Sequence, residues 1–168
     1  ESTISSIPLE ENNENYKKLF NIMLFFKTKI KTSTVDKIIN IININKDKFS
    51  NVSNDTYTEN GFQSSNIVNF FNEDLKKDIL DNQCLYQDIF HLHYIEYGKL
   101  GFQKEHHHSS SEEYSFILYL NDSVGDTIFP HTRISPEKGL LVIFDSSLLH
   151  RSEESVNKKI LVGAIKKK

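Results

Sequence analysis

Residues 139–150 read Gly-Leu-Leu-Val-Ile-Phe-Asp-Ser-Ser-Leu-Leu-His, an apolar run that leads to His150. A short apolar run after a glycine is typical of a buried β-strand, and Pro136-Glu-Lys before it forms a turn signal. Upstream, Ile-Phe-His-Leu-His-Tyr-Ile-Glu-Tyr at 89–97 alternates and is rich in aromatic residues, which favours another strand. Further strands are expected at 114–120, 126–129 and 159–165.

The N-terminal half instead has the spacing of helices. Apolar residues recur at three and four positions from Val35 to about Lys48, as an amphipathic helix requires, with Ser33 or Thr34 as the cap. The same reasoning predicts a helix after Ser64 or Ser65 and helical structure over 73–81. The segment 15–27 has helical spacing but is also compatible with a strand, and the polar segment 49–62 is expected to be a loop.

Helices followed by short strands predict an α+β fold, with a helical layer packed on an antiparallel β barrel or sandwich. The length of 168 residues is typical of one domain. We expect a single domain over 1–168, in which 1–84 is mainly helical support and loops and 85–168 is the β-barrel core.

Composition excludes several classes of function. The net charge of −3 gives no basic excess, so a peptidyl or small-molecule substrate is favoured over nucleic acid. Cys84 is the single cysteine, which prevents an intrachain disulfide and fits a cytoplasmic protein. No apolar run approaches the ~18 residues of a membrane span. The chain begins at Glu1, which is compatible with a targeting segment upstream. Oligomeric state stays open.

Histidines form the candidate metal site. Glu105-His106-His107-His108 contains two imidazoles two residues apart, which face the same way on a strand. His150, far away in the sequence, would complete one face of a metal and leave the opposite positions open. A slip of one residue would point His107 inward instead; we favour the register with His106 and His108 inward.

Six pieces of sequence occur in order around these histidines. They are Tyr97 nine residues before His106, Tyr119-Leu120-Asn121, Gly125-x-Thr127-x-Phe129, Pro136-x-x-Gly139, His150, and Lys159 nine residues after His150. In this order and spacing the chain resembles the 2-oxoglutarate and iron(II)-dependent oxygenases, in particular the prolyl-hydroxylase-like branch. The resemblance covers roughly 94–165.

The resemblance implies a double-stranded β-helix, the jelly-roll or cupin-like barrel, with the N-terminal helices on one face. It implies a dioxygenase that hydroxylates an unidentified substrate and decarboxylates 2-oxoglutarate to succinate, with ascorbate as a supporting reductant. The implied iron(II) ligands are His106, His108 and His150. The implied 2-oxoglutarate-binding residues are Lys159, Tyr119, Thr127 and Tyr97. On the last strand Lys159 is expected to face inward and Lys158 to face solvent.

One departure from the family keeps alternatives open. The family usually carries His-x-Asp or His-x-Glu, whereas this chain has His108, and the exchange removes a negative charge from the site. The third ligand is therefore His108 or a carboxylate; Glu112 and Glu113 would reach only if their loop folds back. The alternatives are a three-histidine cupin-like metal enzyme that does not use 2-oxoglutarate, a non-catalytic barrel that binds a metal or diacid, and an interaction domain. Candidate substrate contacts are Phe102, Gln103, His107, His131 and Arg133.

Overall fold

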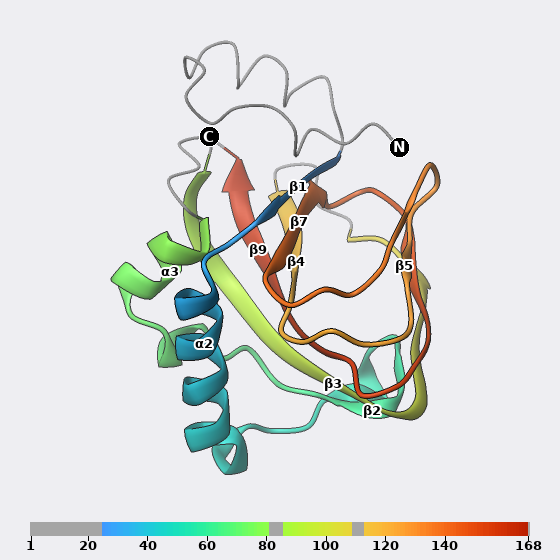
Figure 1. Cartoon of the computed structure of the whole chain (residues 1–168), viewed down its shortest axis with the longest axis horizontal. Helices are drawn as coiled ribbons and strands as arrows, with labels where there is room; N and C mark the ends of the chain where they lie inside the picture. Colours follow the sequence, from blue (N-terminus) through green and yellow to red (C-terminus); the bar gives the residue numbers. More distant parts are fainter. Residues whose placement is uncertain (1–24, 81–85, 109–112, 168) are drawn as a thin grey trace.

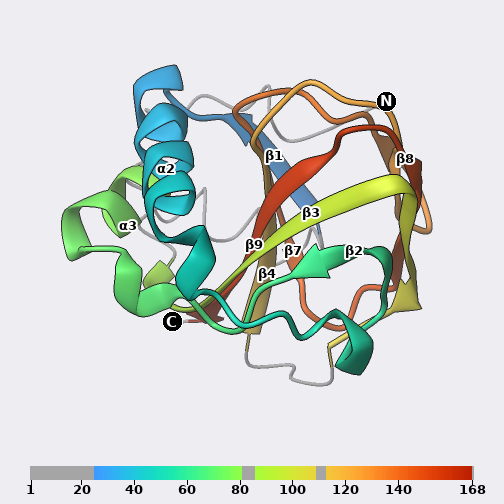
Figure 2. The same ribbon diagram turned by 90° about the horizontal axis from the view of Figure 1, so that it is seen from below.

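A computed structural model describes residues 25–80, 86–108 and 113–167. In it, a curled antiparallel sheet carries two helices on one face (Figures 1 and 2). The helices are α2 (Thr32–Asn45) and α3 (Glu73–Leu80), with short 3₁₀ turns at Lys46–Lys48, Ser53–Asp55 and Val68–Phe70. The strands are β1 (Phe25–Lys29), β2 (Thr58–Gln63), β3 (Tyr86–His106), β4 (Glu113–Tyr119), β5 (Thr127–Ile128), β6 (Arg133–Ile134), β7 (Leu140–Asp145), β8 (His150–Ser155) and β9 (Lys159–Lys167).

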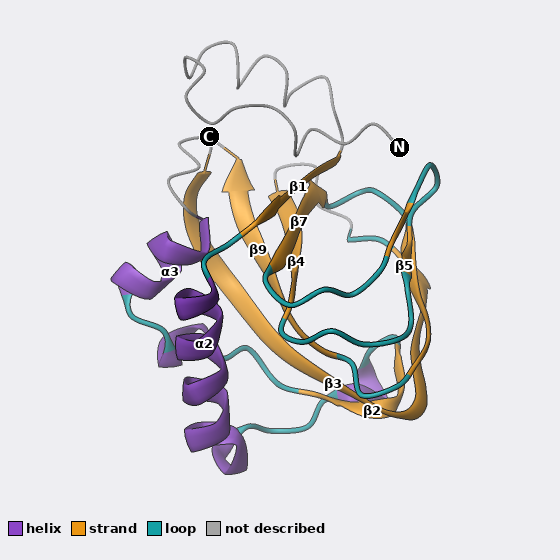
Figure 3. Cartoon of the chain, in the orientation of Figure 1, coloured by secondary structure: helices purple, strands orange, loops and turns teal. Residues whose placement is uncertain are grey.

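Strand β3 links the two halves of the curled sheet. The strand order is β1-β7-β4-β9-β3-β8-β5-β6, and β2 pairs with β3 off this path. The first part of β3 pairs with β9, while its last part pairs with β8 after register shifts between Gly101 and His106. Such irregularities bend a strand and allow a sheet to curl. The expected double-stranded β-helix with helices on one face is confirmed (Figure 3).

Successive side chains of a strand point to opposite faces of the sheet, so the hydrophobic core is divided into two clusters. On the outer face, α2 and α3 bury their apolar stripes against the sheet; this cluster includes Val35, Ile38, Ile42, Leu75, Ile79, Leu92, Leu118 and Leu161. On the inner face a second cluster fills the barrel; it includes Ile95, Tyr97, Ile117, Tyr119, Val142, Phe144 and Ile160. Neighbouring residues of one strand therefore lie in different clusters, as Ile160 and Leu161 do on β9.

Several N-terminal expectations need correction. Helix α2 begins at Thr32, so neither Ser33 nor Thr34 caps it, and no side chain does. No α-helix forms directly after Ser64, where only the 3₁₀ turn Val68–Phe70 is helical, because the Ser64 hydroxyl accepts the Tyr94 amide N–H at 2.8 Å and ties this segment to β3. The expected loop 49–62 contains most of β2.

Two other N-terminal predictions are confirmed. Helical structure over 73–81 is confirmed by α3, and the strand reading of the end of 15–27 is confirmed by β1. The rest of that segment, Cys84 and Glu112 lie outside the described residues. Within the part of the chain that the structure describes, neither helix has the length and apolar character needed to cross a membrane.

Candidate metal centre and diacid site

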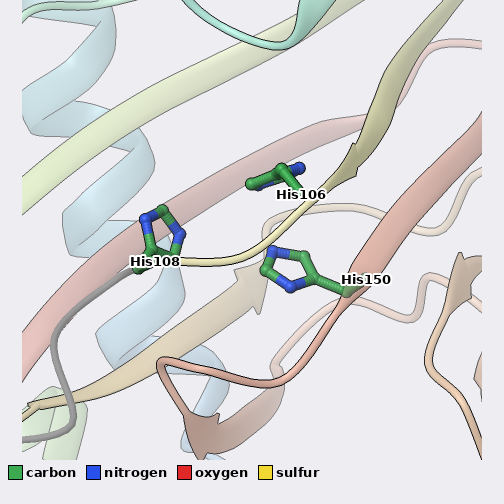
Figure 4. A group of neighbouring side chains, drawn as sticks. All are labelled: His106, His108 and His150. Carbon is green, nitrogen blue, oxygen red and sulfur yellow. The ribbon is translucent and has the colours of Figure 1, made fainter.

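The imidazoles of His106, His108 and His150 converge on one point inside the curled sheet (Figure 4). Their nearest ligating atoms all lie within 4.8 Å of one another. His106, at the end of β3, and His150, at the start of β8, are register partners with ring centroids 4.2 Å apart. His108 lies just past β3, where its backbone N–H donates to the Ser146 carbonyl at 2.7 Å. The structure thus brings together the three predicted ligands in the favoured register, and leaves His107 exposed.

Two of the rings are oriented by backbone carbonyls. The Nδ1 atom of His106 lies 2.7 Å from the Lys104 carbonyl oxygen, and the Nδ1 atom of His150 lies 2.9 Å from the Leu148 carbonyl oxygen. A carbonyl oxygen only accepts, so each Nδ1 must carry the proton. Each Nε2 then holds a free lone pair, which is how proteins usually prepare a histidine for a metal.

The environment keeps the three imidazoles neutral. Burial, reinforced by the neighbouring His106, lowers the pKa of His150 to about 3. Burial likewise lowers the pKa of His106. Partial desolvation and the adjacent imidazoles lower the pKa of His108 to about 4, although this side chain keeps a solvent-exposed edge. A metal ligand must be deprotonated, so this donor set fits a divalent transition metal at neutral pH.

A cavity of about 350 Å³ opens beside the triad. Its lining residues besides the three ligands are Asp55, Thr56, Tyr57, Gln63, Phe90, His91, His93, Ile95, Gln103, Glu113, Ser115, Phe116, Ile117, Phe144, Val162, Gly163 and Ala164. The volume suits a small molecule or one side chain of a larger substrate. The Tyr57 ring stacks on His106, with centroids 4.5 Å apart and planes 11° from parallel.

The inward lysine is Lys158, not Lys159. Lys158 is fully buried, whereas Lys159 is half-buried and pairs in register with Glu96. Lys159 does share a face with Leu161, as predicted, but that face is the outer one, covered by the helices. The prediction failed because Asn157, with a positive φ of 55°, closes a tight turn after β8 and sets Lys158 as the first inward residue.

The Lys158 ammonium has neutral partners only. Its Nζ donates to the Gly125 carbonyl at 3.0 Å and to the Ser152 hydroxyl at 2.7 Å, and no ion pair joins it to a carboxylate in the described residues. Asp126 and Glu153 attract it weakly, but both form ion pairs with Arg133. Burial lowers the pKa of Lys158 to about 7. A buried cation in this setting is costly unless an anion joins it.

Hydroxyl groups surround this ammonium. The Tyr97 and Tyr119 rings lie 5.0 and 5.8 Å from the Lys158 Nζ. The Tyr119 hydroxyl bonds the Thr127 hydroxyl at 2.6 Å. The Tyr97 hydroxyl is buried and makes no hydrogen bond of normal geometry with the described residues, although Ser152 is near enough to moderate the rise in its pKa that burial causes. A buried polar atom left in this way is rare and points to a missing partner.

The cavity beside the histidine triad and the surroundings of Lys158 lie along the same two strands, β3 and β4. Ile95 and Ile117 line the cavity beside the triad. Tyr97 and Tyr119 are the next inward residues of β3 and β4, and belong to the same inner cluster. The chemistry of these residues fits a diacid with one end at the histidines and its far carboxylate at Lys158, with donors from the hydroxyls.

Several residues of this site were missed from the sequence. His91, His93, Asp55 and Tyr57 line the cavity. The alternation of 89–97 does place His91 and His93 on the inner face with Ile95, so that signal was available. Asp55 and Tyr57 lie in the segment 49–62, which was predicted only as a polar loop, and no pattern in it singled out these two residues.

Of the five candidate substrate contacts, Gln103 lines the cavity and the other four do not. Arg133 is instead paired with Asp126 and Glu153. Glu113 also lines the cavity, although the sequence suggested that it reaches inward only if the loop folds back.

Comparison with known proteins by sequence finds nothing: no family model and no curated protein matches. Comparison with solved structures finds the same fold at low identity. A Pseudomonas putida prolyl-4-hydroxylase matches with a TM-score of 0.66 and 13% identity over 94% of this chain and 99% of that chain. A Trichoplax adhaerens prolyl hydroxylase, in complex with a hypoxia inducible factor peptide fragment, matches with a TM-score of 0.65 and 13% identity over 98% and 95%.

A Streptomyces hygroscopicus protein with nickel, 2-oxoglutarate and hygromycin B bound matches with a TM-score of 0.63 and 9% identity over 96% of this chain and 88% of that chain. The fold expected from the sequence resemblance is therefore that of solved 2-oxoglutarate oxygenases.

Proposed function

We propose that this chain is a 2-oxoglutarate- and iron(II)-dependent dioxygenase that hydroxylates a peptidyl or small-molecule substrate. The observation that carries the proposal is the pairing of two sites in one barrel. One is a triad of neutral imidazoles, and the other is the buried Lys158 ammonium that lacks an anionic partner. The fold-level neighbours support it, since their names include prolyl hydroxylases and a complex with nickel and 2-oxoglutarate.

The chain's own residues have separate tasks in this proposal. His106 and His150 would hold iron(II) through Nε2, and His108 would supply the third ring nitrogen. Lys158 meets the far carboxylate of 2-oxoglutarate, with hydroxyl donors from Tyr97, Tyr119 and Thr127. The apolar inner wall keeps water from the reacting groups. Bound iron(II) and 2-oxoglutarate supply, with dioxygen, the oxidising power for C–H hydroxylation, with loss of carbon dioxide to give succinate.

The direct test is turnover of 2-oxoglutarate by the purified chain with iron(II), ascorbate and air. We expect slow succinate formation without substrate that depends on both metal and 2-oxoglutarate. Oxygen consumption without 2-oxoglutarate would favour the cupin-like alternative. Tight binding of 2-oxoglutarate with no succinate would favour a non-catalytic diacid-binding barrel, for which the histidine in place of a carboxylate is the motivating observation. No binding of 2-oxoglutarate to the metal-loaded chain would contradict the proposal.

Tyr97→Phe is expected to weaken 2-oxoglutarate binding several-fold without destabilising the ligand-free protein. The hydroxyl that it removes is buried and makes no hydrogen bond of normal geometry with the described residues, so the free energy of unfolding should stay level or rise by up to ~1 kcal/mol. Tyr119→Phe is the matched control, because its hydroxyl bonds Thr127, and its loss should cost about 1 kcal/mol of unfolding free energy. Chemical denaturation measures both. Equal destabilisation by the two changes would show that Tyr97 already has a partner.

Binding of 2-oxoglutarate is expected to take up a proton above neutral pH. The pKa of Lys158 is lowered to about 7 in the free protein, so above this pH the amine is mainly neutral, while a bound carboxylate favours the charged form. The affinity should be level below about pH 7 and fall by up to about tenfold per pH unit above it. Calorimetry at pH 8 in buffers of different ionisation enthalpy measures the uptake. Binding without proton uptake would contradict a role for Lys158.

A further inference from the structure

The cavity beside the triad is lined by negative but not by positive side chains. Asp55 and Glu113 are its two carboxylates, and neither lysine nor arginine occurs among the described lining residues. The histidines there include His93, whose pKa burial lowers. The two positive charges of iron(II) and the two negative charges of 2-oxoglutarate would cancel. The two carboxylates then set the net charge of the rest of the cavity.

Asp55 is an exposed residue in the lining of the cavity beside the histidine triad. It ends the 3₁₀ turn Ser53–Asp55, two residues before Tyr57, whose ring stacks on His106. No ion pair involves Asp55 in the described residues. The cation that comes near this segment is Lys104, whose backbone N–H donates to the Tyr57 carbonyl, but its ammonium pairs with Glu59 at 2.8 Å.

Glu113 supplies the second carboxylate from a different element. It is the first residue of β4 and contributes its side chain to the cavity lining. Its register partner on β9 is Lys166, but the Lys166 ammonium lies 5.5 Å from the Phe90 ring centroid, and no ion pair joins it to Glu113. Two elements distant in sequence therefore bring free carboxylates to one cavity.

Neutral groups in the same wall also present acceptors. The Nδ1 atom of His93 lies 3.0 Å from the Ser64 carbonyl, so it must donate there and leave Nε2 as an acceptor. The Gln103 side-chain N–H donates to the Thr58 hydroxyl at 3.3 Å, so that amide's remaining acceptor is its carbonyl oxygen. These acceptors suit a ligand that carries N–H donors, and the two carboxylates repel a phosphate or carboxylate.

We propose that the substrate presents a protonated amine or guanidinium to this cavity and is hydroxylated at a carbon near that cation. This rests on the proposed function for the chemistry, but the preference for a cation rests on the cavity alone. Asp55, which is exposed, and Glu113, which is partly buried, favour a cationic ligand by charge complementarity.

The test compares three matched probes on the zinc-loaded protein with 2-oxoglutarate: N-acetyl-arginine methylamide, its neutral isostere N-acetyl-citrulline methylamide, and N-acetyl-glutamate methylamide. Ligand-observed NMR titration gives each Kd. We expect the arginine probe to bind about tenfold more tightly than the citrulline probe and the glutamate probe to bind most weakly. Asp55→Asn and Glu113→Gln should each reduce the preference for arginine, and higher salt should reduce it too.

Asp74→Asn is the control variant, because Asp74 lies in a shallow groove between the helices, far from the cavity lining, and should leave the preference unchanged. A preference below twofold, a preference for glutamate, or no detectable binding of the arginine probe would each overturn the inference. Succinate release is measured separately. If the preference is found but succinate never forms, the proposed function fails and only the cavity's preference for a cation stands. If succinate forms without the preference, the inference fails alone.

Discussion

His150→Ala is expected to abolish metal binding while the fold is retained. His150 is the register partner of His106 in the sheet. Its Nδ1 donates to the Leu148 carbonyl, so its Nε2 lone pair is free. Removal of an outer-shell partner alone typically costs 10- to 100-fold in affinity, so loss of a ligand should weaken metal binding by at least about 100-fold. Competition with a chromophoric chelator measures the change, and circular dichroism checks the fold.

His107→Ala is the matched control for this experiment. His107 is adjacent to two of the proposed ligands in sequence, but its side chain is exposed. Metal affinity should change by less than about twofold, as for other exposed surface positions. Equal losses in His107→Ala and His150→Ala would mean that the metal is held elsewhere or in another register.

Lys158→Met is expected to abolish measurable 2-oxoglutarate binding at ordinary concentrations while metal affinity is unchanged. Methionine has similar length and keeps the barrel filled, but it removes the one cation placed among Tyr97 and Tyr119. Loss of a buried charge partner costs about 2–5 kcal/mol, which raises the Kd at least about 30-fold. The desolvation cost of burying an ammonium in the folded state also disappears, so the ligand-free protein should be at least as stable as the wild type.

Lys159→Met separates the two neighbouring lysines. Lys159 lies on the outer face opposite Glu96, so its replacement should leave the 2-oxoglutarate Kd within about twofold. Isothermal titration of both variants with zinc bound gives the comparison. A larger effect from Lys159→Met than from Lys158→Met would reverse the assignment that the structure supports.

The convergence of the three histidines was predictable from the sequence because half of it is local. Strand alternation alone places His106 and His108 on one face, and an apolar run ending in His150 needs only to become the strand that pairs beside them. Which lysine faces inward was not predictable in the same way. Alternation correctly separated Lys158 from Lys159, but their assignment to faces depends on a one-residue difference in the turn at Asn157.

The N-terminal errors have a different physical cause. Residues after Ser64 have apolar spacing typical of a helix, but the Asn66 side chain accepts the Leu92 amide N–H at 3.0 Å, and such long-range bonds fix the segment against β3. β2 is polar and contains Gly61, so its sequence carries little strand signal, and it exists because β3 offers a pairing edge. Tertiary contacts override local propensity at both places, and the segment just before β2 contributes Asp55 and Tyr57 to the cavity.

The most direct test of the proposed centre is a crystal structure with zinc and 2-oxoglutarate bound, since zinc does not consume the co-substrate. We expect one anomalous peak at about 2.1 Å from Nε2 of His106, Nε2 of His150 and one ring nitrogen of His108. We also expect the far carboxylate of 2-oxoglutarate at about 3 Å from the Lys158 Nζ. A peak away from these rings, or a diacid whose far end lies at Lys159 or outside the barrel, would contradict the proposed centre.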